Sequence, residues 1–164
     1  MRDRDETGRP RNARPRDAYG RPLPRGAAGT PTMPDDLTVT PTEALEQAQR
    51  LLDEDRPFHA HEVLEAAWKA APEAERELWR GLAQVAVGVT HVRRGNPRGA
   101  RALLERAADR IEEHSRNAPH APYDIDAPGI VAEARRIAES AENAADGTEL
   151  PIALRLTRSG RPET

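Results

Sequence analysis

The stretch that decides the fold is Leu78–Val92, LWRGLAQVAVGVTHV. Leu and Val recur along one side of this stretch at helical spacing, and Ala83, Ala86 and Val87 fill much of the opposite side. A helix that is apolar nearly all round belongs in the middle of a helical bundle, where neighbours cover every face. We therefore predict an all-α protein with a central helix over about residues 73–94.

Helix start signals lie on both sides of the central stretch. Thr40 is followed by Pro41 and Glu43, which is the pattern of a capping box with proline at the first helical position. Asn96 before Pro97 and Asp126 before an apolar-periodic run give two more starts. The predicted flanking helices cover about residues 41–52, 57–70, 97–115 and 127–141.

A weak internal repeat relates two of these helices. Residues 55–65 align with residues 95–105 at a spacing of 40, with Pro, Ala, Leu and Glu matching. Each copy opens the second helix of a helical hairpin. We therefore predict about five helices, arranged as two tetratricopeptide-like helical hairpins plus a capping helix. Two copies are fewer than an open solenoid needs, which favours closure into a compact bundle.

The composition divides the chain into three parts. Residues 1–36 form an Arg/Pro/Gly-rich tail that we expect to be disordered, because they offer almost nothing to bury. Residues 40–145 hold the predicted helical domain. Residues 146–164 are predicted to be an extended or frayed tail, in which residues 150–156 pack on the bundle as an extended segment.

Charge and composition narrow the class of protein. The first 34 residues carry eight basic and four acidic groups, whereas the remainder carries 17 basic and 24 acidic groups. Nucleic-acid association is therefore expected only through the tail. The longest uncharged apolar run, residues 81–92, is too short to span a bilayer, and cysteine is absent. We expect a cytoplasmic protein without a membrane partner.

The helix at residues 57–70 carries ionisable groups on its expected inward face. On a helical wheel, His61 and Glu65 fall beside the apolar residues Phe58, Leu64 and Trp68. By the same wheel Glu62 lies at the edge of this face and His59 further round, so we expect neither to point inward. An ionisable group on a buried face has to be paired or hydrogen-bonded.

The central helix has a matching polar seam. Gly81 and Gly88 each cost about 1 kcal/mol of helix stability, and close approach of another helix would compensate. Gln84 and His91 lie on the same seam and would point into that contact. The candidate polar cluster is therefore His61, Glu62, Glu65, Trp68, Gln84 and His91.

Three interpretations of this cluster are open. It is a hydrogen-bonded network that fixes helix register, or a site for a divalent transition metal bound by His61, Glu65 and His91, or a His/Glu acid–base pair. The sequence places no Ser or Cys nucleophile beside it and contains no Gly-rich phosphate loop.

Three blocks in order resemble a known family. They are FHAHEVLEAAW at residues 58–68, GLAQVA at 81–86 and HVRRGNPRGA at 91–100. They resemble the "domain of unknown function 309" family over about residues 42–112. The resemblance implies a small all-helical fold of bacteria and archaea with no established activity, and the six cluster residues occupy its signature positions.

The sequence thus favours a protein-interaction or structural module that binds a protein partner or associates with itself. A metal-binding protein or metal-dependent enzyme is the first alternative. Nucleic-acid association through the Arg-rich tail is the second.

Overall fold

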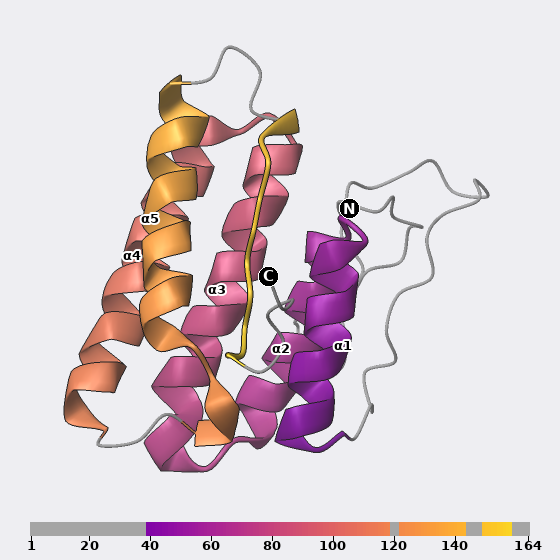
Figure 1. The fold of residues 1–164 in the computed structure, drawn as a ribbon, viewed down its shortest axis with the longest axis vertical. Helices are drawn as coiled ribbons and strands as arrows, with labels where there is room; N and C mark the ends of the chain where they lie inside the picture. The colour runs from indigo at the N-terminus through magenta and orange to yellow at the C-terminus, as the bar shows by residue number, and fades with distance from the viewer. Residues whose placement is uncertain (1–38, 119–121, 144–148, 159–164) are drawn as a thin grey trace, which may run out of the picture.

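A computed structural model describes residues 39–118, 122–143 and 149–158, and this part of the chain folds into five α-helices packed in a compact bundle (Figure 1). The elements are α1 (Pro41–Asp53), α2 (Pro57–Ala70), the short 3-10 turn η1 (Glu73–Glu75), α3 (Arg76–Arg93), α4 (Pro97–Asn117), the 3-10 turn η2 (Pro122–Asp124) and α5 (Ala127–Asn143). The predicted all-α fold class with about five helices is confirmed. The predicted disordered tail, residues 1–36, lies outside the described residues.

The predicted helix starts are confirmed by their side-chain caps. Thr40 Oγ1 accepts the Glu43 main-chain N–H at 3.2 Å and donates to the Glu43 carboxylate at 2.9 Å. Asn96 Oδ1 accepts a main-chain N–H at the start of α4 at 3.1 Å, and Asp126 Oδ1 does the same for α5 at 3.2 Å. Each cap satisfies a donor that the first turn of a helix leaves unpaired.

Each helix packs mainly on its neighbour in sequence, α1 on α2, α2 on α3, α3 on α4 and α4 on α5. The predicted central helix α3 lies in the middle of the bundle, with α1 and α5 on opposite sides of it (Figure 1). Its apolar stripe is buried over its whole length, through Leu78, Leu82, Val85, Val89 and Val92.

The two glycines of α3 mark its closest approach to α4. A Cβ atom placed on Gly81 would lie 2.6 Å from Ile111 Cγ1, and one placed on Gly88 would lie 2.5 Å from Leu104 Cγ. Both Ile111 and Leu104 are fully buried. The expected close contact of this seam with another helix is confirmed, and the helix is α4.

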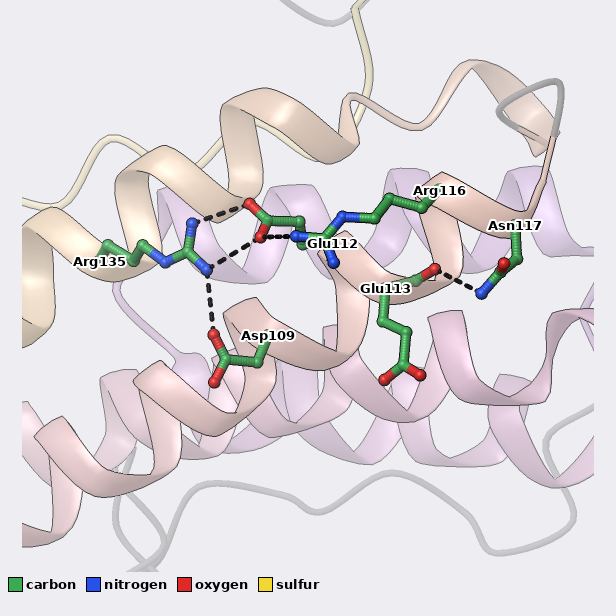
Figure 2. Close-up of polar contacts among 6 residues, drawn as sticks. All are labelled: Asp109, Glu112, Glu113, Arg116, Asn117 and Arg135. Carbon is green, nitrogen blue, oxygen red and sulfur yellow. Dashed lines mark hydrogen bonds and ion pairs between the residues drawn. The ribbon is translucent and has the colours of Figure 1, made fainter.

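Ion pairs on the surface connect α5 to α4 (Figure 2). Arg135 on α5 reaches the carboxylates of Asp109 at 3.0 Å and Glu112 at 2.9 Å, and Glu112 also pairs with Arg116 at 2.8 Å. Water screens such exposed pairs, so the apolar contact between the two helices carries most of the stability.

Residues 150–158 form an extended segment, here called the C-terminal strap. It runs along the face of α3 between α1 and α5 (Figure 1). Leu154 and Leu156 are buried, and Thr157 forms an isolated antiparallel bridge with Ile125, two residues before α5 begins. The strap covers the surface formed by α1, α3 and α5, here called the inner side of the bundle. On this side α1 and α3 make few direct contacts with each other.

Among the described helices, none combines the length and the apolar character that crossing a bilayer requires.

Candidate functional site

The buried side of α2 differs from the predicted one. His59 is fully buried at 0% exposure, whereas the His61 side chain keeps 21% of its surface exposed. The expectation that His59 points away from the core is therefore wrong. The reason is that α2 packs on both α1 and α3, so its buried arc runs through Ala60, Val63 and Leu64 instead of through Glu65 and Trp68.

His61 and Glu65 contact each other through their side chains one helical turn apart. His61 Nε2 lies 2.8 Å from Glu65 Oε2, and Lys69 Nζ lies 3.1 Å from the other carboxylate oxygen. The hydrogen bond from His61 is the main cause that lowers the pKa of Glu65 from 4.5 to about 2, against the opposing effect of burial. Glu65 is 34% exposed, so the pair lies at the solvent edge of α2 and not in the core.

Two arginines, Arg80 of α3 and Arg94 directly after it, cover aromatic residues of α2. The guanidinium of Arg80 lies 5.7 Å from the Trp68 ring centroid, and that of Arg94 lies 6.0 Å from the Phe58 ring centroid. Both distances are within the range of a cation–π contact. Phe58, His61, Glu65 and Trp68 thus form a half-buried row along α2, where the two arginines help to fix α2 against α3.

Gln84 and His91 make their side-chain hydrogen bonds elsewhere. Gln84 Oε1 accepts a hydrogen bond from Arg110 Nε of α4 at 3.1 Å. His91 Nδ1 lies 3.2 Å from the side-chain nitrogen of Asn96, the residue that caps α4. Burial, together with the nearby charge of Arg94, lowers the pKa of His91.

The structure therefore brings together only part of the expected cluster. Within the described residues, the polar contacts join His61 to Glu65 and join Gln84 and His91 to α4 and its cap. Glu62 lies half-buried on α2. The same described residues contain no group of three or more His, Cys, Asp or Glu placed to hold a metal ion. The divalent-metal hypothesis stays a prediction, which elemental analysis of the purified protein tests.

A second constellation, which the sequence did not single out, lies on the inner side of the bundle and binds the main chain of the strap. From α1, Gln49 Nε2 donates to the Leu154 carbonyl at 2.9 Å and Gln49 Oε1 accepts the Leu156 N–H at 2.8 Å. From α3, Arg93 Nη1 donates to the Leu150 carbonyl at 2.8 Å. Side chains of two helices thus replace the ladder of hydrogen bonds that a neighbouring strand would provide.

α5 adds a third set of contacts to the strap. Arg136 Nη2 donates to the Pro151 carbonyl at 2.8 Å, and Glu133 Oε2 accepts the Ala153 N–H at 2.7 Å. Burial raises the pKa of Glu133, but the hydrogen bonds from Arg136 and Ala153 outweigh it and hold this pKa below the ordinary value. Glu133 is therefore a charged acceptor, which makes a stronger hydrogen bond than a neutral one.

The alternation of Leu150, Ile152, Leu154 and Leu156 was the available sequence signal for this site. It predicts an extended segment with one apolar side, and every such segment needs partners for its main-chain groups. The identity of those partners depends on which helix faces the segment, and this is a tertiary property.

A cavity of about 300 Å³ lies beside the strap, between the α1–α2 turn and α3. Two ion pairs border it. Arg93 Nε lies 2.8 Å from Asp55 of the α1–α2 turn, and Arg155 Nη1 of the strap lies 2.7 Å from Asp53 at the end of α1. The inner side therefore combines a bound extended segment with space that this segment leaves unfilled.

These features define a small all-helical domain whose own C-terminal strap lies between α1, α3 and α5. Residues 45–103 match the model of the family described as "Domain of unknown function (DUF309)". The resemblance predicted from the three sequence blocks is confirmed for this region. The match covers most of α1, all of α2 and α3 and the first turns of α4, and α5 and the strap lie outside it.

One curated relative is similar to part of the chain. Over 48 residues the chain is 44% identical to "Uncharacterized protein YpuF" of Bacillus subtilis (strain 168). The alignment covers 29% of this chain and 28% of that relative. No solved structure matches the chain.

Proposed function

We propose that this domain is a helical protein-interaction module that binds an extended polypeptide segment on its inner side, between α1, α3 and α5. The observation that supports the proposal is the strap itself. Residues 150–158 lie there in extended conformation, and side chains of three helices bind their main-chain groups.

The strap is bound mainly through hydrogen bonds to its main-chain groups. Hydrogen bonds to main-chain groups do not depend on the side chains of the bound segment, so they give affinity for any extended chain that fits. Pockets for every second side chain then provide the specificity, as in domains that bind peptides by adding a strand. Leu154 and Leu156 occupy such buried positions.

The arrangement of the helices agrees with this function. The sequence predicts that the hairpins α1–α2 and α3–α4 are tetratricopeptide-like, and this prediction supports the proposal because proteins built from such hairpins bind extended ligands. Gln49 and Arg93 of the inner side lie in the region that matches the family, whereas Glu133 and Arg136 lie beyond it. A partner polypeptide would use the same side chains as the strap.

The test is binding of a separate peptide to a chain whose strap has been released. The double variant Leu154→Asp/Leu156→Asp places two charges at buried positions and should expel the strap from the full-length chain. A labelled peptide with the wild-type sequence of residues 149–158 should then bind, as measured by fluorescence anisotropy. The wild-type chain is the control, because its own strap competes at an effective concentration in the millimolar range.

A third variant makes the test specific for the inner side. Adding Gln49→Ala to the release variant removes two hydrogen bonds to the peptide and should weaken binding about tenfold or more. Circular dichroism reports whether the release variant keeps its helices. A helical release variant that binds no peptide would refute the proposed function.

A further inference from the structure

The apolar side chains of the strap are buried to different extents against the inner side of the bundle. Leu154 and Leu156 are buried, with 3% and 2% exposure, but Ile152 is only partly buried although it lies on the same side of the extended segment. Ile152 borders the cavity of about 300 Å³. The surface is therefore larger at this position than an isoleucine side chain requires.

The cavity is lined by both apolar and charged side chains. Leu52, Pro57 and Val89 provide apolar surface, Arg93 of α3 brings one guanidinium group, and Arg155 of the strap itself brings a second. Each guanidinium already pairs with an aspartate, at 2.8 and 2.7 Å. A charged side chain entering here would compete with these pairs. An aromatic ring would instead contact the apolar walls and offer its face to a guanidinium without breaking either pair.

We propose that the inner side prefers an extended partner segment that carries an aromatic side chain at the position occupied by Ile152. This inference rests on the proposed function and adds the side-chain specificity to it. The chain's own strap then acts as a weaker occupant in cis, which a partner with a phenylalanine or tryptophan at this position displaces.

The first experiment uses the full-length chain and needs no added peptide. In Ile152→Phe and Ile152→Trp the ring should fill the cavity and slow hydrogen exchange of the Leu156 amide, which bonds to Gln49. Ile152→Ala should speed the same exchange. Faster exchange in both aromatic variants than in the wild-type chain would overturn the inference, because it would mean that the cavity does not accept a ring.

The second experiment uses peptides of residues 149–158 with Ile, Ala, Phe or Trp at position 152, bound to the Leu154→Asp/Leu156→Asp chain. The Phe and Trp peptides should bind about tenfold more tightly than the Ile peptide, and the Ala peptide more weakly. A cyclohexylalanine peptide is the matched control, because it keeps the size of phenylalanine and removes the π face.

The two proposals fail differently. If the peptides bind but the Ile peptide binds best, the preference for an aromatic side chain is wrong and the interaction function stands. If no peptide binds while Ile152→Trp slows exchange in the full-length chain, the cavity accepts the ring and the proposed function is wrong.

Discussion

The carboxamide oxygen of Gln49 accepts the main-chain N–H of Leu156 at 2.8 Å, although the two residues are 107 positions apart in the sequence. The nitrogen of the same carboxamide donates to the Leu154 carbonyl at 2.9 Å. One side chain of α1 therefore satisfies two main-chain groups of the strap. A glutamine is suited to this because its amide has the same donor and acceptor as a peptide unit.

Replacement of Gln49 by alanine should loosen the strap without disturbing the helices. The two hydrogen bonds to the strap are lost, together with the one that Gln49 Nε2 donates to Asp53 Oδ1 at 2.9 Å, and we expect the free energy of unfolding to fall by about 1–3 kcal/mol. Hydrogen exchange of the Leu156 amide should accelerate more than that of amides in α3. Glu46→Ala is the control, since Glu46 is an exposed residue of the same helix. Unchanged exchange at Leu156 would contradict the assignment of Gln49 as the residue that holds the strap.

Replacement of His59 and replacement of His61 should differ in their effect on stability. His59→Ala removes a fully buried ring, so we expect a cost of about 2 kcal/mol or more. His61→Ala removes a partly exposed side-chain contact with Glu65, and we expect a cost of about 1 kcal/mol or less. Urea unfolding of both variants measures the difference. A larger cost for His61→Ala than for His59→Ala would contradict this prediction, because it would mean that the partly exposed contact of His61 stabilises the fold more than the buried ring of His59.

The His61–Glu65 pair should make stability depend on pH in the acid range. The pKa of Glu65 is lowered from 4.5 to about 2 in the folded protein. A carboxyl group with a depressed folded pKa stabilises the fold above its unfolded pKa, and this contribution disappears as pH falls through the folded pKa. Wild type should therefore lose more stability than Glu65→Gln between pH 4.5 and pH 2. Thermal unfolding of both proteins across this pH range measures the difference. Unfolding temperatures that fall in parallel for wild type and Glu65→Gln would contradict the prediction.

Gly88→Ala should destabilise the protein even though alanine is the better helix former. The gain in helix propensity is about 1 kcal/mol, whereas a Cβ atom at 2.5 Å from Leu104 Cγ forces overpacking that costs about 1–3 kcal/mol. The double variant Gly88→Ala/Leu104→Ala relieves this clash, so its cost should be smaller than the sum of the two single costs. Additive costs would mean that the two residues are not in contact.

The local features of the fold were predictable from the sequence. Thr40, Asn96 and Asp126 act as caps because capping depends on residues within the same turn of chain. The central position of α3 followed from its apolar surface on all sides. These predictions needed no knowledge of which helix is the neighbour.

The candidate site was less predictable because it depends on helix orientation. The wheel placed His61 inward and His59 outward, but α2 packs on two helices and its buried arc is shifted toward His59. The glycine seam was expected to meet another helix, and the sequence could not say that α4 would be the one. Gln49 was missed for the same reason, since its role appears only when the strap lies beside it.

The strap also has a consequence for how the protein folds. Helices that pack on their sequence neighbours form contacts across short loops. Short loops close quickly and at a small cost in conformational entropy. The contact of Gln49 with Leu156 closes a loop of more than one hundred residues and is expected to form last, after the folding transition state. Interactions that form late slow unfolding and leave the folding rate nearly unchanged. We therefore expect the strap to set the unfolding rate of the bundle, and so the lifetime of the native state, and to have little effect on the folding rate.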